Sequence, residues 1–436
     1  MVLNNKMNNI IRKLPTKQLI GIAFSGGLDT SAAIVWINKK GGIVYSYTAN
    51  LGQYDEKNMF LIIGKAISYG ARKASIIDCR KALIKEGLLA LQCKAFHIKT
   101  ANLVYFNTTP LSRIVTSISI ALEMNINNIN IWSDGSTYKG NDIERFYRYG
   151  LLINNKLKIY KPWLDNSFVN ELGGRKEMYQ LMIKNGFYYK KQRKRYYSTD
   201  CNILGNTYEA KELEYLDFNI KKIELIMCLA FWKKKVAVPI EILKLRYRHG
   251  LPTSINNIKL NIQIALIEEA NSIGSRHGLG VTDQLESRII ETKSRGIYES
   301  PGVKLLYIAY ERLTTGIHDE YTIEQLRNYG RSLGKLLYLG RWFDSQSLTI
   351  KEAINKWIAT IINGEIILEL RKGNDYSIIS TKSDNLIYNI KAITMEKASS
   401  KFTSKDRIGQ LNITNFSIEN TRKALLGYSK LKKILW

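Results

Sequence analysis

A glycine-rich turn carries the most distinctive chemistry in the chain. Residues 21–31 read GIAFSGGLDTS. The segment 18–24 is apolar and uncharged, as in a short strand, and apolar side chains recur at helical spacing over residues 32–37. A helix start presents unpaired backbone N–H groups, and Gly26 and Gly27 allow a bulky anion to approach them closely. The sequence therefore predicts a loop that binds phosphate groups.

The spacing of this loop excludes two common phosphate-binding motifs. A Walker loop needs the pattern G-x-x-x-x-G-K followed by Ser or Thr, and a dinucleotide fingerprint needs G-x-G-x-x-G. Residues 25–31, SGGLDTS, fit neither pattern. They resemble instead the pyrophosphate loop of ATP pyrophosphatases, which cleave ATP between the α and β phosphates and adenylate a carbonyl oxygen. The alternative is an ordinary helix start that is capped by Ser25 and Asp29.

Two further stretches are dense in polar side chains. Residues 105–110 read YFNTTP, and residues 134–146 read DGSTYKGNDIERF. The second stretch follows a predicted strand directly, so its donors and acceptors are expected at the same sheet edge as the glycine-rich loop. Such a concentration of glycines, charges and hydrogen-bonding groups favours a functional loop over a purely structural one.

Alternating strands and helices must position these loops. Strands are predicted at 43–50, 73–79 and 130–132, and helices at 58–69, 80–92 and 110–123. This order is typical of βαβ units in an α/β fold with a parallel sheet and right-handed crossovers. A nucleotide should then lie beyond the carboxyl ends of the strands, where Ala49 is placed to touch the adenine.

The second half of the chain loses this alternation. Helical patterns over 166–186 are followed by mixed elements, predicted at 224–231, 237–248, 262–272, 284–292 and 304–315. Residues 364–371 and 375–380 are predicted to pair as strands around a turn at 373–374. We expect a nucleotide-binding domain over 1–190, an α+β substrate-binding and multimerisation domain over 191–415, and a basic C-terminal helical tail over 416–436.

Composition restricts the class of protein. The chain has 436 residues and 45% hydrophobic content, enough for two domains with cores. Its scattered cysteines form no C-x-x-C pair, which argues against disulfides and a zinc site and favours the cytoplasm. No protein metal site is predicted. No apolar run is long enough to cross a membrane, and residues 1–17 lack the apolar core of a signal peptide.

The formal net charge of +27 raises the question of a nucleic-acid partner. Lysines are spread along the whole chain, with local runs at 190–195 and 233–235 that match no RNA-binding motif. The abundance of Ile, Asn, Lys and Tyr also suggests a codon bias toward A and T. Nucleic acid is therefore not an expected partner.

The longer motifs resemble one family. The pyrophosphate loop, the polar stretches at 105–110 and 135–146, and the segment TANLGQ at 48–53 resemble argininosuccinate synthases. The likeness continues over nearly the whole chain, through the segments at 197–200 (YSTD), 278–280 (GLG), 293–299 (KSRGIYE) and 370–376 (LRKGNDY). It implies an ATP pyrophosphatase-type nucleotide-binding domain followed by a synthetase domain, in a homotetramer.

The resemblance also implies a reaction. These carbon–nitrogen ligases of arginine biosynthesis join citrulline to aspartate through a citrullyl-adenylate, releasing AMP and pyrophosphate, with Mg²⁺ expected beside ATP. A ureido carbon is a poor electrophile, and adenylation turns its oxygen into a good leaving group. The protein must therefore position three substrates and balance phosphate charge.

The resemblance assigns residues to ATP and to catalysis. The implied ATP-binding residues are Ala23, Phe24, Ser25, Gly26, Gly27, Leu28, Asp29, Thr30, Ser31, Ala49, Gly135, Thr137, Asp142 and Asp200. Asp29, Asp142 and Asp200 are the implied catalytic residues. A carboxylate near phosphates can act through Mg²⁺ or through ribose hydroxyls, and both remain open.

The amino-acid substrates are assigned in the same way. Thr137, Asn141 and Asp142 are the aspartate candidates. The purely structural interpretation of Asp142 is a helix N-cap before residue 143, a role that is compatible with binding aspartate. The citrulline candidates are Tyr105, Asn141, Arg145, Ser198, Thr207, Glu209, Glu286 and Tyr298. Arg145 offers a fork for a carboxylate, and the pocket should close between the domains. For Glu209 and Glu286 the alternative is a solvated helix face.

Three positions depart from the family pattern. Cys201 stands where the family usually has serine, Ser133 replaces a glycine, and the loop at 232–235 is basic where an acidic residue is usual. These changes are expected at the surface or behind the site, where they could lower activity.

Two other functions are alternatives for this sequence. A different pyrophosphate-loop ligase would need paired cysteines for sulfur transfer or a glutaminase unit for amidation, and neither is present in the sequence. A basic RNA-binding or assembly protein without catalysis would not need to keep the intact polar site. The tail at 421–436 is either a helix that reaches another subunit or a frayed end.

Overall fold

A six-stranded, all-parallel sheet forms the first part of the chain in the computed structural model, which describes residues 9–56, 58–96, 104–187, 196–260, 262–388 and 403–428. Its strand order is β1-β6-β5-β2-β3-β4. The strands are β1 (Ile10–Ile11), β2 (Leu19–Ala23), β3 (Ile43–Asn50), β4 (Lys73–Asp78), β5 (Ile131–Asp134) and β6 (Lys158–Tyr160). Chain order reverses between β2 and β5, and such a reversal opens a crevice at the carboxyl ends of the strands.

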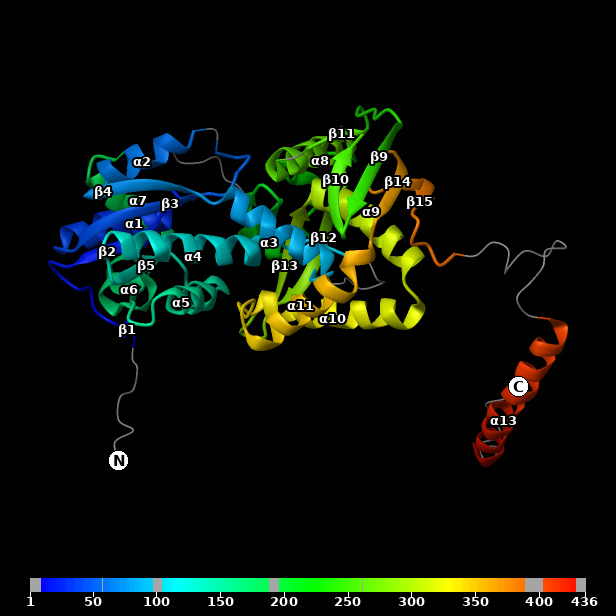
Figure 1. Cartoon of the computed structure of the whole chain (residues 1–436). Helices are drawn as coiled ribbons and strands as arrows, with labels where there is room; N and C mark the ends of the chain where they lie inside the picture. The colour runs from blue at the N-terminus through cyan, green and yellow to red at the C-terminus, as the bar shows by residue number, and fades with distance from the viewer. Residues whose placement is uncertain are drawn as a thin grey trace, which may run out of the picture. The chain divides into compact units, whose positions relative to one another are not determined.

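Helices cover both faces of this sheet (Figure 1). On one face, side chains of α1, α2, α6 and α7 pack against Ile20 and Ile22 of β2. On the other face, α4 and α5 pack against Tyr47 and Trp132. The helices are α1 (Leu28–Lys39), α2 (Met59–Ser68), α3 (Arg80–Gln92), α4 (Thr109–Ile126), α5 (Asp142–Ile153), α6 (Asn166–Leu172) and α7 (Arg175–Lys184), with a short 3-10 turn η2 (Pro162–Leu164). The predicted parallel nucleotide-binding fold is confirmed.

Two antiparallel sheets follow. The first has the order β12-β13-β8-β7, and the second β11-β10-β9-β14-β15. Their strands are β7 (Ser198–Asn202), β8 (Gly205–Glu209), β9 (Glu241–Arg248), β10 (Leu251–Ile255), β11 (Ile258–Lys259), β12 (Val281–Ser287), β13 (Lys293–Glu299), β14 (Gly364–Leu370) and β15 (Tyr376–Lys382). The pairing of β14 with β15 confirms the predicted hairpin.

Four long helices accompany these sheets. They are α8 (Gln263–His277), α9 (Pro301–Ile317), α10 (Glu320–Tyr338) and α11 (Ser345–Trp357), with 3-10 turns η3 (Lys211–Glu214), η4 (Ile220–Lys222) and η5 (Ala359–Ile361). The predicted α+β character is therefore confirmed. The predicted boundary near 185–197 includes residues 188–195, which lie outside the described part of the chain, as does the basic run at 190–195.

Two predicted elements are wrong. Residues 224–231 form neither helix nor strand, because their backbone is bound by a side chain. The buried Glu299 carboxylate accepts hydrogen bonds from the N–H groups of Ile226, Met227 and Cys228, at 2.8 Å for Cys228. Residues 284–292 are also not one element, since β12 ends at Ser287 and a turn leads into β13.

One hydrophobic core joins the parallel sheet to the second part. Buried side chains of α3 and α4 belong to the same cluster as those of α8, α9, α10 and α11. Trp342 donates from Nε1 to Glu86 Oε2 at 2.7 Å, and Tyr310 donates its hydroxyl to the Gln92 carbonyl at 2.9 Å. Figure 1 shows α3 running from the parallel sheet into this second part. Both parts belong to one unit, Met1–Leu386.

The second unit, Ile387–Trp436, contains helix α13 (Ser404–Tyr428). Helix α13 begins before residue 416, where the predicted tail starts, and residues 429–436 lie beyond the described range. No helix in the described ranges is both long and apolar enough to cross a membrane.

Two helical glycines give opposite predictions for stability. Gly330 in α10 is buried, and a Cβ there would lie 2.6 Å from the Lys94 carbonyl oxygen and 2.7 Å from the Cys93 carbonyl oxygen. Gly64 in α2 is exposed, with no atom within 4 Å of the same position. Gly330→Ala should lower the free energy of unfolding by about 1–3 kcal/mol through overpacking. Gly64→Ala should raise it by roughly 0.5–1 kcal/mol through helix propensity.

Thermal unfolding of the two variants checks this pair. A lower Tm for Gly330→Ala and an unchanged or higher Tm for Gly64→Ala are expected. Equal shifts of Tm in the two variants would show that the close packing of α10 against the end of α3 does not decide whether the substitution stabilises or destabilises the protein.

Candidate active site

The glycine-rich loop lies between β2 and α1, at the reversal of strand order. Gly26 has a φ of 74°, in the left-handed region that glycine adopts without strain. The N-cap residue of α1 is Gly27, and no side chain caps the helix. The alternative of a helix capped by Ser25 and Asp29 is therefore wrong. The N–H groups of the first turn remain available to an anion, as a phosphate loop requires.

The loop after β5 packs directly against this helix start. A Cβ added at Gly135 would lie 2.7 Å from Cγ2 of Thr30, so a larger residue requires either the Thr30 side chain or the loop to move. The neighbouring Asp134 is buried and anchors the loop, because its carboxylate pairs with Lys161 and accepts from Trp132 Nε1 at 2.7 Å. The structure thus brings Gly135 beside the residues predicted to bind phosphate.

The remaining nucleotide candidates line the same edge of the sheet. Ala49 is buried near the end of β3, beside β2. The backbone of Phe24 is held between Tyr47 and Thr48, with its N–H donating to the Tyr47 carbonyl at 2.9 Å. Thr137 is exposed on the turn after β5. Asp29 forms no ion pair with any other residue in the described ranges.

Arg113 of α4 lies between two predicted catalytic carboxylates. Its Nε is 2.8 Å from Asp142 Oδ2, and its Nη2 is 2.6 Å from Asp200 Oδ2. Loss of water would raise the pKa of Asp142, but the charges of Arg113 and Arg145 outweigh it and hold that pKa below its ordinary value. Asn141, not Asp142, is the N-cap residue of α5, so the N-cap alternative for Asp142 is wrong.

Arg145 is buried and its donors are largely engaged. Nε and Nη2 donate to the Tyr338 carbonyl at 3.0 and 2.8 Å, and Nη1 donates to Asp142 at 3.1 Å. The guanidinium also lies over the Tyr338 ring, 4.9 Å from its centroid. To bind the carboxylate of citrulline, Arg145 would have to use the guanidinium N–H groups that these hydrogen bonds leave over.

Glu286 is the centre of a second network. Its carboxylate accepts from the hydroxyls of Tyr105 at 2.8 Å and Tyr338 at 3.1 Å. Asn141 donates from Nδ2 to the Tyr338 hydroxyl at 2.8 Å, and the rings of Tyr105 and Tyr298 lie 5.0 Å apart. Four of the predicted citrulline residues are thus brought together from different elements.

One face of the four-stranded sheet carries most of the remaining candidates. Residues two apart on a strand, and residues directly opposite on paired strands, point to the same face. Ser198 lies opposite Glu209, Asp200 opposite Thr207, and Thr207 opposite Tyr298. Glu286 has the same parity on β12. Both glutamates therefore stand on strands, and the helix-face alternative is wrong for each.

Glu209 has the most perturbed carboxyl group of this face. Its side chain reaches solvent, but the surrounding protein removes water from the carboxylate. That loss of water, with the charges of Asp142, Asp200 and Glu286, raises its pKa to about 7, against the opposing effect of Arg288. Such a group changes charge near neutral pH.

Sequence reasoning missed Arg113 and Tyr338. Arg113 is the single charged residue in the stretch 108–121, and a lone charge in a buried helix was a usable signal. Tyr338 stands among apolar residues at the end of α10 and gave no such signal.

Two of the three departures from the family pattern are buried and the third is exposed. Ser133 and Cys201 are buried, and the Ser133 hydroxyl has no hydrogen-bond partner in the described residues. Only the lysines of the loop at 233–235 are exposed. Two of the three changes therefore lie inside the protein.

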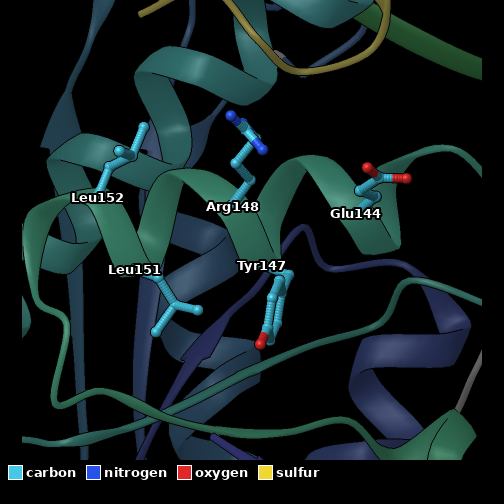
Figure 2. A pocket seen from close by; sticks show the side chains of 5 residues that line it. All are labelled: Glu144, Tyr147, Arg148, Leu151 and Leu152. Atoms are coloured by element: carbon cyan, nitrogen blue, oxygen red, sulfur yellow. The ribbon is translucent and has the colours of Figure 1, made fainter. Parts of the chain in front are cut away.

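A wide hollow on the outer side of α5 lies apart from these networks. It has a volume of about 530 Å³ and is lined by Glu144, Tyr147, Arg148, Leu151 and Leu152, all from that helix (Figure 2). None of these residues is a predicted site residue. Across the part of the chain that the structure describes, no group of three or more His, Cys, Asp or Glu side chains could hold a metal ion.

Three solved structures share a limited likeness with the chain. The U34-tRNA thiolase NcsA of Methanococcus maripaludis is 12% identical, with a TM-score of 0.27, and the match covers 42% of this chain and 63% of that one, less than two thirds of it. A predicted tRNA methyltransferase subunit of Methanocaldococcus jannaschii is 16% identical, with a TM-score of 0.24 over 39% and 89% of the two chains. Leishmania major tyrosyl-tRNA synthetase is 10% identical, with a TM-score of 0.17 over 79% and 48%.

Two family models match the chain in succession. The model for the arginosuccinate synthase N-terminal HUP domain, a family that uses ATP, matches residues 19–178. The model for the arginosuccinate synthase C-terminal domain matches residues 197–421. Because the two matches follow one another over most of the chain, the protein belongs to the argininosuccinate synthase family.

Proposed function

We propose that this chain condenses citrulline with aspartate through a citrullyl-adenylate, releasing AMP and pyrophosphate, as a step of arginine biosynthesis. The observation that carries the proposal is that three groups meet the segment that joins β5 to α5. The uncapped start of α1 packs against Gly135, the Arg113 carboxylate cluster includes Asp142, and the Glu286 network reaches Asn141 through Tyr338. They correspond to the three substrates: ATP, aspartate and citrulline.

The phosphates of ATP would bind at the first turn of α1. The free N–H groups and the helix dipole favour an anion there, and glycine at 26, 27 and 135 leaves room for it. Mg²⁺ bound with ATP would neutralise part of the phosphate charge. Asp29 is suited to hold it, because Mg²⁺ often takes one or two carboxylates together with phosphate oxygens, and Asp142 and Asp200 are paired with Arg113.

Citrulline would bind along the sheet face that carries Glu209, Glu286 and Tyr298. Carboxylates there can accept hydrogen bonds from the ureido N–H groups, which orients the ureido oxygen toward the α-phosphorus. A bond from this oxygen to phosphorus forms while the bond to the pyrophosphate oxygen breaks. Positioning of the two reacting atoms supplies most of the acceleration in such a transfer.

Aspartate would bind beside Asn141 and Asp142. Its amine attacks the activated ureido carbon, the carbon–oxygen bond to AMP breaks, and the proton lost from the amine passes to the departing phosphate oxygen of AMP. Asp142 can accept a hydrogen bond from the amine and orient it. We also place this activity in the cytoplasm of the cell and in a homotetramer, with the C-terminal helix at a contact between subunits.

Omission of single substrates tests the proposed function. The purified protein with ATP, Mg²⁺, citrulline and aspartate should form AMP and argininosuccinate in equal amounts. AMP formation should need both amino acids. Release of ADP, or AMP formation that does not depend on citrulline, would contradict the proposal.

The packing of Gly135 against Thr30 gives a prediction for nucleotide binding. Gly135→Ala requires either the Thr30 side chain or the loop after β5 to move, because the new Cβ would lie 2.7 Å from Thr30 Cγ2. We expect the KM for ATP to rise about tenfold or more, since displacements of about 1 Å can cost as much as 100-fold in rate. Initial-rate kinetics measure this, with Gly64→Ala as the control that meets no neighbouring atom. An unchanged KM for ATP would show that Gly135 does not contribute to the phosphate site.

The raised pKa of Glu209 predicts the pH dependence. If ionised Glu209 accepts from citrulline, kcat/KM for citrulline falls below a pH of about 7, where this carboxylate is protonated. Arg288 lowers this pKa, so Arg288→Gln should move the acid limb to higher pH, by roughly half a unit. Arg276→Gln, on a distant pair with Glu241, is the control. If the fall in kcat/KM for citrulline at low pH occurs at the same pH in Arg288→Gln, a group other than Glu209 controls it.

A further inference from the structure

Arg113 connects the two parts of the candidate site. It stands on α4, while its partners stand at the start of α5 and on β7. The three side chains are 18%, 27% and 20% exposed, so solvent screens this cluster only in part. Phe146 lies beneath the guanidinium, 5.7 Å away by its ring centroid. The cluster is therefore partly enclosed and held from three sides.

The two carboxylates depend on Arg113 to different degrees. Asp142 also pairs with Arg145 at 3.1 Å. Asp200 has no cationic partner but Arg113 among the described residues. Both Nη1 and Nη2 of Arg113 donate to the Asp200 carboxylate, at 3.4 and 2.6 Å. Removal of the guanidinium would leave Asp200 without a counter-charge beside Asp142 and Glu209, where like charges repel.

The Glu286 network is separate from this cluster. Tyr338 holds it through its hydroxyl, which donates to Glu286 and accepts from Asn141. Arg145 touches both groups, but its contact with Tyr338 uses the backbone carbonyl. Loss of the Tyr338 hydroxyl would therefore disturb Glu286 and Asn141 while leaving the ring and the carbonyl in place for Arg145.

We propose that Arg113 and Tyr338 are positioning residues, each of which holds a different set of side chains in the site. Arg113 holds Asp142 and Asp200 for aspartate and ATP, and Tyr338 holds Glu286 for citrulline. This inference rests on the proposed function. Neither residue needs to touch a substrate, since each acts by fixing side chains that do.

Two sets of variants, each expected to affect a different amino-acid substrate, test the inference. Arg113→Lys and Arg113→Ala should lower kcat/KM for aspartate by about 10- to 100-fold, with the lysine variant less affected, because lysine keeps the charge but not the fork. Their KM for citrulline should change by less than about twofold. Tyr338→Phe should raise the KM for citrulline about tenfold through loss of one hydrogen bond to a charged group. The KM for aspartate should rise by a smaller factor, because Asn141 loses one partner while Asp142 keeps Arg113 and Arg145.

Matched controls separate these effects from general damage. Arg371 also pairs with two carboxylates, Glu369 and Asp375, but lies on the β14–β15 sheet. Tyr310 is a buried tyrosine whose hydroxyl donates to a carbonyl outside the site. Arg371→Lys and Tyr310→Phe should keep the KM values of the unmodified protein. Guanidinium ions added to Arg113→Ala should restore part of its activity and none of that of Tyr338→Phe.

Each other outcome overturns the inference. Equal changes in both amino-acid KM values in both sets would show a single network. Absence of guanidinium rescue, or loss of folded protein in both Arg113 variants while Arg371→Lys folds, would make Arg113 a residue of the fold alone. Failure of the proposed function is a different result, because the unmodified protein would then form no AMP that depends on both amino acids.

Discussion

Repulsion among neighbouring carboxylates is the constraint on which the site depends. Asp142, Asp200, Glu209 and Glu286 converge from α5, β7, β8 and β12. Carboxylates this close would repel one another and take up protons unless cations lie between them. Arg113 and Arg145 supply those cations, and the pKa of Asp142 stays low as a result. Loss of water and the charges of Asp142, Asp200 and Glu286 act on Glu209 against Arg288, and its pKa rises to about 7.

The same arrangement suits the proposed substrates. In the proposed function, ATP would bring negative charge to the start of α1, where backbone N–H groups and the helix dipole favour an anion. The amino acids would bring ammonium and ureido donors to the carboxylates. Each proposed substrate would then meet the opposite kind of group, which favours binding and orientation together.

Much of the fold followed from the sequence because local patterns and tertiary structure agree there. The strands at 43–50 and 73–78 alternate with helices that bury one side, and the glycine-rich loop stands directly after β2. The loop at 224–231 could not be predicted, since its order comes from Glu299, about 70 residues further along the chain. Likewise Tyr338 acquires its role only from partners that lie 52 and 197 residues away in sequence. The sheet parity of Glu209 and Glu286 also required knowledge of strand register.

Helix α3 has a consequence for how ligands enter and leave. It is packed against the helices of the second part and hydrogen-bonded to that part from its middle, through Glu86, and from its C-terminal end, through Gln92. Opening the two parts about α3 would break this shared core. In the proposed function, ligands would therefore enter and leave through local rearrangement of loops and side chains.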